Sequence, residues 1–188
     1  MEYPYYRSEW EAYPFLAEPG DDLCCDYEML TDEIASLIGM LRAEVLETAL
    51  ADPVKSTLST ELGRMNAYVY HLNPSLRKGV EVTEEERDKL LEMTEVMQAR
   101  TGNKSFVLPE GTQAASLAHV IRCKCKQLVR LTYRYLETNG VSQFPDTRLA
   151  ILIDVPNLLS GYFFGMALWL NKLAGVKETP FESRHYSL

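Results

Sequence analysis

Four side chains that can carry positive charge recur at helical spacing in the middle of the chain: His119, Arg122, Lys126 and Arg130. At 100° per residue they fall within one narrow arc of an α-helix. Like charges at this spacing repel one another unless an anion lies nearby. The pattern therefore predicts a helix whose basic face meets a small anion or a paired carboxylate, although a solvated basic face beside acidic surface groups would show the same spacing.

A short apolar segment, Phe-Val-Leu-Pro-Glu-Gly-Thr at residues 106 to 112, leads directly into this helix. Pro109 fixes its own φ, and Gly111 allows a backbone conformation that a side chain would forbid. Thr112 can accept hydrogen bonds from the first free amides of the helix. We expect a rigid turn beside the basic face, in which Phe106 either anchors the loop in the core or meets a ligand.

Three separated segments resemble the ATP:cob(I)alamin adenosyltransferases of the propanediol-utilisation type. Residues 106–112 and the helix after them are similar to that family's Phe-Val-Leu-Pro-x-Gly-[Ser/Thr] motif, which is followed by a His, an Arg and a further basic residue. Residues 31–39 resemble Val-Asp-Glu-Leu-Asn-x-x-Ile-Gly on its first helix, and residues 157–160 resemble Asn-Arg-Leu-Ser-Asp on its last. The resemblance spans residues 26–174 and preserves the order of the motifs.

This resemblance implies an enzyme that transfers the 5′-deoxyadenosyl group from ATP to cob(I)alamin, giving adenosylcobalamin and triphosphate. It implies ATP, a corrinoid and Mg²⁺ as ligands, and a homotrimer with sites between subunits. In such a trimer Asp32 would pair with Arg122 of the partner subunit, and Lys126 would join Arg122 in stabilising charge on the phosphates. The product would pass to an adenosylcobalamin-dependent enzyme.

The resemblance also assigns residues to the corrinoid side of the site. Phe106 would lie against the corrin and exclude the lower axial base, which makes cobalt easier to reduce. Asn157 would help to hold substrate, with Gly111, His119 and Ser160 nearby. Plainer roles compete with these: His119 suits a structural position better than a cobalt ligand, and Asn157 and Ser160 can satisfy neighbouring backbone. Asp32 can simply favour the positive end of a helix dipole.

The chain departs from the family pattern where the nucleotide would bind. The family's phosphate loop, Thr-x-Thr-Gly-Asp-x-Gly-x-Thr, has only residues 18–22 as a remnant. Lys126 stands where the family has a second Arg, so a point charge replaces a planar fork. Val129 replaces a Glu, Leu158 an Arg and Gly161 an Asp. A second hypothesis follows, in which the protein is a non-catalytic corrinoid carrier, sensor or chaperone that has lost ATP turnover.

Apolar residues at helical spacing predict an all-α fold, a five-helix up-and-down bundle. The expected helices span about 26–50, 58–72, 84–97, 113–138 and 146–174, the last bent near Pro156. A capping box at Thr83 opens the third, and Asn139-Gly140 closes the fourth. An irregular arm is expected at residues 1–22, the bundle at 23–176 and a tail at 177–188. The aromatic run Tyr162, Phe163, Phe164 and Trp169 is expected to pack the bundle.

Composition restricts the function classes. A net charge of −8 over 188 residues argues against general binding to nucleic acid or to an anionic membrane. The N-terminus shows no secretory leader, which favours a cytoplasmic protein with reduced thiols. The four cysteines, among them the pair Cys24-Cys25, lack the spacing of a zinc site, so no metal site is expected. The apolar stretch 155–170 is expected to fall short of a bilayer span.

Overall fold

The computed structural model describes residues 6–102, 106–141 and 144–184, and these form a bundle of five α-helices. The helices are α1 (Cys24–Glu47), α2 (Asp52–Leu72), α3 (Glu84–Thr101), α4 (Gln113–Asn139) and α5 (Asp146–Leu173). The described residues contain one isolated β-bridge, between Val107 and Pro180, and no sheet. The predicted all-α, five-helix fold is therefore confirmed.

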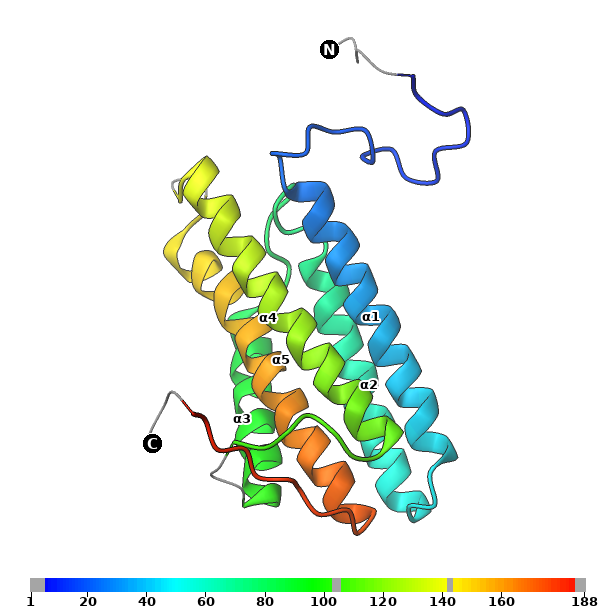
Figure 1. Cartoon of the computed structure of the whole chain (residues 1–188). Helices are drawn as coiled ribbons and strands as arrows, with labels where there is room; N and C mark the ends of the chain where they lie inside the picture. Colours follow the sequence, from blue (N-terminus) through cyan, green and yellow to red (C-terminus); the bar gives the residue numbers. More distant parts are fainter. Residues whose placement is uncertain (1–5, 103–105, 142–143, 185–188) are drawn as a thin grey trace.

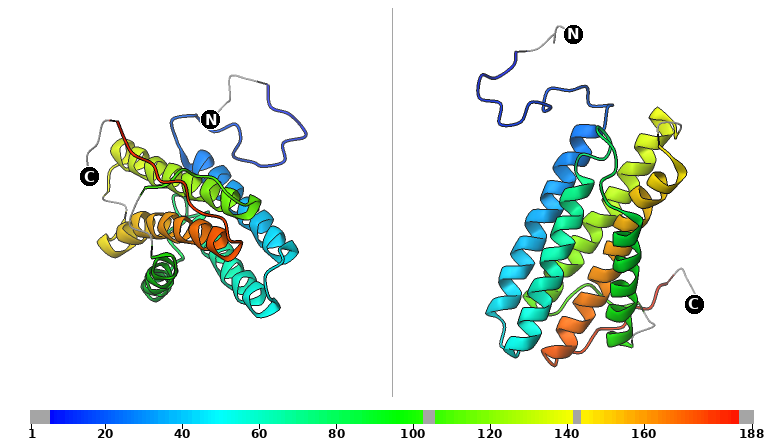
Figure 2. Two further views of the ribbon diagram at one scale, coloured as in Figure 1. Left: turned by 60° about the horizontal axis from the view of Figure 1, so that its bottom comes forward. Right: turned by 180° about the vertical axis from the view of Figure 1, so that it is seen from behind.

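Successive helices alternate in direction along the bundle (Figure 1). α4 packs against both α1 and α5, α2 packs against α1, and α3 lies on the outer side of α5 (Figure 2). The described part of the N-terminal arm lies at the end of the bundle where α1 begins, and the loop before α4 lies at the other end (Figure 1). The helices thus hold the remnant of the phosphate loop and the Phe106 loop far apart within one chain.

The periodic apolar positions supply the core, as expected. Ile34, Ile38 and Leu41 on α1 are fully buried against residues such as Leu62 and Val69 on α2. Burying each such side chain contributes roughly 1.5–3 kcal/mol relative to leaving it in water. These faces fix the rotation of each helix about its axis and so determine which side chains point outward.

Polar caps determine where two of the helices begin. The predicted capping box of α3 is present: Thr83 Oγ1 accepts from the Glu86 amide at 3.1 Å, and the Thr83 amide donates to Glu86 Oε2 at 2.9 Å. Thr112 caps α4 in the same way, accepting from the Ala115 amide at 3.1 Å. α4 therefore begins at the residue that follows the Phe106 loop, which ties that loop to the basic helix.

Helix α5 is the core helix of the bundle. Its residues Thr147–Leu173, which extend beyond the stretch 155–170 considered in the sequence, are long and apolar enough to cross a membrane by length and composition. However, 56% of that helix's most apolar window is buried inside the bundle. Tyr162 and Phe163 are fully buried, as predicted, and the Tyr162 hydroxyl donates to Glu61 Oε2 at 2.7 Å, which joins α5 to α2.

The described part of the N-terminal arm, residues 6–22, forms turns but no helix. Arg77, which follows α2, fastens this arm to the bundle. Its guanidinium contacts the Glu18 carboxylate, lies 2.7 Å from Glu28 Oε1 and stacks 3.9 Å from the centroid of the Phe15 ring. The Glu18 end of the phosphate-loop remnant is consequently already paired with a cation of its own chain.

Candidate active site

The predicted charged residues Asp32 and Arg122 lie on turns of α1 and α4 that are close to each other in the bundle. Glu33 on α1 and Lys124 on α4 form an ion pair at 2.6 Å. Asp32 directly precedes Glu33, and Arg122 lies two residues before Lys124, so the turns that carry them are neighbours. Asp32 is exposed and accepts a hydrogen bond from the Tyr70 hydroxyl at 2.9 Å, which raises the pKa of Tyr70. The structure gives no ion pair between Asp32 and Arg122 within the chain.

Arg122 is half-buried and has few polar partners. Its Nη2 lies 3.8 Å from Cys123 Sγ, and its guanidinium carbon lies 5.4 Å from the centroid of the Phe164 ring on α5. Its Nε is buried without a hydrogen-bond partner. Within the described residues no carboxylate pairs with it. A guanidinium held against an aromatic ring with donors to spare is suited to receive an anion from outside the chain.

The predicted basic face is narrower than its spacing indicated. Lys126 and Arg130 are exposed, but His119 is only 3% exposed and packs against Phe164, with its ring centroid 6.2 Å from that of Phe164. Burial, followed by the nearby Arg122 charge, lowers the pKa of His119 to about 4. His119 is therefore neutral at pH 7, and the positive charge belongs to Arg122, Lys126 and Arg130.

The loop before α4 presents its aromatic ring to solvent. Phe106 is 60% exposed, so the reading in which it anchors the loop in the core is wrong. The loop is held through its backbone: the Phe106 carbonyl accepts from the Phe181 amide at 2.9 Å, and the Leu108 amide donates to the Thr179 carbonyl at 2.9 Å. An exposed ring on a braced backbone is available to a flat apolar ligand.

Gly111 has the backbone conformation expected of it, one that a side chain would forbid. Its φ is +125°, and a Cβ at this position would lie 2.1 Å from the Asn171 side-chain oxygen. Any other residue would have to displace the buried Asn171 as well as adopt a strained backbone. Gly111 therefore shapes the loop by allowing close approach to α5.

Asn157 and Ser160 lie in different environments although they are three residues apart on α5. Asn157 is exposed, and its Nδ2 donates to the Ile153 carbonyl at 2.9 Å. Ser160 is only 6% exposed. The two side chains therefore differ in exposure, although their spacing places them on neighbouring turns of one helix side. Asn157 remains reachable by a ligand, whereas Ser160 belongs to the packing of the bundle.

The cysteines are free thiols, and the described residues contain no group of three His, Cys, Asp or Glu that could hold a metal. Burial, followed by the nearby Asp22, raises the pKa of Cys24 to about 12. Burial also raises the pKa of Cys25. Both thiols therefore stay protonated near neutral pH and are weak metal ligands in this state.

No sequence motif pointed to three residues at the site. Tyr70 donates a hydrogen bond to Asp32, Phe164 contacts His119 and Arg122, and Asn171 packs on Gly111. Phe164 was expected only to pack the bundle. A signal for Asn171 was present, since an amide near the end of a strongly apolar helix must find buried partners. Tyr70 had no such signal.

This geometry defines a helical bundle with an exposed aromatic loop at one end and, on a basic helix, an arginine that has no carboxylate partner among the described residues. Solved structures of PduO-type ATP:corrinoid adenosyltransferase from Lactobacillus reuteri share the fold. A phenylalanine-to-alanine variant complexed with cobalamin and ATP has a TM-score of 0.67 at 22% identity, covering 86% of this chain and 87% of that one. An arginine-to-lysine variant complexed with ATP has a TM-score of 0.66 at 23% identity, covering 86% and 88%.

Sequence comparison identifies the family. A corrinoid adenosyltransferase of Bacillus subtilis strain 168 is 27% identical over 157 residues, which are 80% of this chain and 76% of that protein. The family model for cobalamin adenosyltransferases matches residues 21–170. The chain belongs to the cobalamin adenosyltransferase family, a family of transferases. The resemblance drawn from three motifs is confirmed.

Proposed function

We propose that the protein transfers the 5′-deoxyadenosyl group of ATP to cob(I)alamin, producing adenosylcobalamin and triphosphate. Membership of the family supports this reaction. Within this chain, the reaction is supported by Arg122, whose half-buried guanidinium has no carboxylate partner among the described residues. Such a group is stabilised when an anion binds, and triphosphate is an anion of suitable charge.

The reaction is a displacement at carbon. The electron pair on cobalt(I) forms the cobalt–carbon bond to the ATP 5′ carbon, and the bond from that carbon to the phosphate oxygen breaks. Triphosphate leaves with the electron pair of that bond. Arg122 and Lys126 stabilise the growing negative charge on the leaving group, and the site holds both substrates in line.

Mg²⁺ enters this proposal with ATP rather than through a resident site. The described residues offer no cluster of three metal-ligating side chains. Mg²⁺ bound to the phosphates would neutralise part of their charge, and the protein would then supply only the two basic side chains. This chain's own residues are thus assigned to binding and charge stabilisation.

Phe106 supplies the apolar surface for the corrinoid. Its exposed ring can lie against the lower face of the corrin, where it offers cobalt no ligand and leaves no room for the displaced base. Asn157, exposed on α5, is assigned to holding substrate; Gly111 shapes the loop. Ser160 and His119 are buried and act indirectly, through packing beneath the site.

Lys126 is compatible with ATP binding. The phenylalanine and the arginine replaced in the two Lactobacillus reuteri variants are 20 positions apart, and Phe106 and Lys126 have the same separation here. The variant with lysine in place of that arginine was solved in complex with ATP. A lysine at this position therefore does not require the carrier hypothesis.

The proposal includes a homotrimer with shared sites, a cytoplasmic location and delivery of the product to an adenosylcobalamin-dependent enzyme. Asp32 and Arg122 support the shared site, because neither forms an ion pair with another described residue although their turns are adjacent. An Asp32 from the partner subunit would give the guanidinium a planar, bidentate partner.

Replacing Arg122 tests the proposal. Arg122→Ala should lower kcat/KM by about 10²-fold or more, because it removes a donor aimed at the leaving group. Arg122→Lys should also be poor, since an ammonium cannot reproduce the fork. Arg130→Ala, on the exposed part of the same helix, is the matched control and should keep most of the activity. Full activity in Arg122→Ala, measured at unchanged melting temperature, would refute the assignment.

A further inference from the structure

One buried side chain holds the loop that carries Phe106. Asn171, near the end of α5, is 1% exposed. Its Oδ1 accepts from the Thr112 amide at 3.0 Å, and its Nδ2 donates to the Glu110 carbonyl at 2.9 Å. The same Nδ2 donates to Glu178 Oε1 at 3.0 Å. A single amide therefore joins α5, the loop before α4 and the segment that follows α5.

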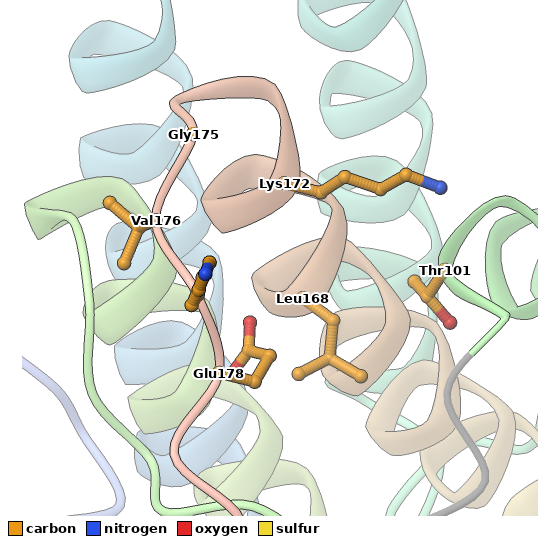
Figure 3. A pocket seen from close by; sticks show the side chains of 7 residues that line it. Thr101, Leu168, Lys172, Gly175, Val176 and Glu178 are labelled. Atoms are coloured by element: carbon orange, nitrogen blue, oxygen red, sulfur yellow. The ribbon is translucent and has the colours of Figure 1, made fainter.

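The segment after α5, residues 174–184, runs back toward the Phe106 loop. The chain turns at Gly175, whose φ is +71°, and the Val176 amide donates to the Asn171 carbonyl at 2.9 Å. Figure 3 shows Gly175, Val176 and Glu178 along this segment, with Glu178 beside Leu168 of α5. A pocket of about 320 Å³ lies between this segment and the ends of α3 and α5, so the segment is not closely packed against these helices there. Hydrogen bonds to Asn171 and to the Phe106 loop hold the segment instead.

Polar contacts, rather than burial, set the position of Phe106. Phe106 is 60% exposed, so burial of its ring contributes little to holding the loop in this conformation. The loop is instead bound at Phe106 and Leu108 to the segment 179–181, and at Glu110 and Thr112 to Asn171. Asn171 is the only one of these holding groups that reaches both the loop and the segment by its side chain.

We propose that Asn171 is a positioning residue for adenosyl transfer, which together with Glu178 sets where the Phe106 ring meets the corrin. This inference rests on the proposed function. Asn171 touches no reacting atom; it fixes a loop whose ring must exclude the lower ligand. A displacement of about 1 Å at such a group can cost on the order of 10²-fold in rate. The close approach of Gly111 to Asn171 also fixes the position of the loop, because a side chain at position 111 would displace Asn171.

Asn171→Asp is the most direct variant, because it keeps the size of the side chain. The carboxylate cannot donate to the Glu110 carbonyl and repels the Glu178 carboxylate. Asn139→Asp is the matched control: Asn139 also donates its Nδ2 to a backbone carbonyl, that of Tyr135 at 3.0 Å, but at the opposite end of α4. In the double variant Asn171→Asp with Glu178→Gln, the new amide at position 178 can donate to the carboxylate at position 171, which removes the repulsion and restores the link between the two side chains, while the Glu110 carbonyl still lacks its donor.

Hydrogen exchange and kinetics give separate readouts. In Asn171→Asp, the amides of residues 106–112 and 176–181 should exchange faster while the core helices keep their protection. Its kcat should fall at least about tenfold with little change in KM for ATP, and the paramagnetic resonance of bound cob(II)alamin should show a larger share with a lower ligand. The double variant should recover part of both effects, and Asn139→Asp should show neither.

Two results would overturn the inference. One is an Asn171→Asp protein with wild-type kcat and a wild-type cob(II)alamin spectrum. The other is a loss of kcat that follows a fall in melting temperature, with the double variant no better than the single one, which would make Asn171 merely structural. Failure of the proposed function is distinguishable, because the wild type itself would then form no adenosylcobalamin; hydrogen exchange would still show whether Asn171 holds the loop.

Discussion

Arg122 shows how far residue types alone lead toward a site. The spacing of the basic residues predicted a charged helix face, and the structure places Arg122 there without a carboxylate partner among the residues that it describes. Spacing could not predict that His119 is buried, because a position at the edge of a helical arc faces either solvent or core depending on the neighbouring helix. Here α5 covers it with Phe164. The exposure of Phe106 was likewise open, since apolar loop residues are usually anchors.

Lys126 should limit the rate, because an ammonium meets phosphate oxygens as a point charge. Lys126→Arg should raise kcat by roughly fivefold, which corresponds to about 1 kcal/mol of added transition-state stabilisation from a second charge-assisted hydrogen bond. Lys124→Arg is the control, since Lys124 is engaged with Glu33. Steady-state kinetics at saturating cobalamin would measure both variants, and a Lys126→Arg protein slower than wild type would contradict the role assigned to Lys126.

His119 should make stability depend on pH. Its pKa of about 4 in the folded protein lies below the unfolded value of about 6.5, so its neutral form is favoured by folding. The contribution is fully present above pH 6.5 and is lost as the pH falls toward 4. Between pH 7 and pH 5 the wild type should lose about 2 kcal/mol of unfolding free energy through this residue. Urea denaturation of His119→Gln at pH 7 and pH 5 should show a shallower loss than that of the wild type. Equal losses in the two proteins would contradict this role of His119.

At the scale of elements, the helices could be predicted and the contacts between loops could not. Apolar periodicity and the caps at Thr83 and Thr112 located helix starts, because these signals are local. The pairing of residues 106–108 with 179–181 has no local signal: it joins distant segments through backbone groups that every residue carries. The glycine that ends α3 at position 102 was also missed, though its φ of +64° is typical of helix C-termini.

The capping box of α3 gives a test of how these local signals contribute to stability. Thr83→Ala should lower the free energy of unfolding by about 1 kcal/mol, because the Glu86 amide loses its acceptor at the start of the helix. Thr60→Ala is the matched control, since the exposed Thr60 hydroxyl only donates back to the Ser56 carbonyl within α2. Chemical denaturation would measure both. An equal effect of the two substitutions would show that the cap contributes nothing.

At the scale of the whole molecule, one bundle contains only part of the proposed site. The Phe106 loop and the arm remnant at residues 18–22 lie at opposite ends of the chain's own bundle (Figure 1). Asp32 and Arg122 form no ion pair within the chain. Both facts favour a site completed by a second copy of the chain. Sequence patterns describe one chain at a time, which is why only the family resemblance indicated an assembly.

The assembly can be measured directly. We expect light scattering of the purified protein at micromolar concentration to give the mass of a trimer of 21.4-kDa chains. The Asp32→Ala and Arg122→Ala variants should weaken the trimer or leave it intact but inactive. Asp52→Ala, at the start of α2, is a control for loss of an exposed carboxylate. A wild-type monomer, with and without ATP and cobalamin, would contradict the shared site.

If the proposed function is correct, this bundle catalyses adenosyl transfer although its nucleotide-binding residues depart from the family pattern, with Lys126 in place of an arginine. The most direct measurement is an anaerobic reaction of the wild-type protein with cob(I)alamin, kept reduced by a strong reductant, in the presence and absence of ATP and Mg²⁺. Absorbance reports adenosylcobalamin, and ion chromatography reports triphosphate. We expect ATP-dependent formation of both products in equal amounts. A protein that binds cobalamin but forms neither product would contradict it and would establish a corrinoid carrier instead.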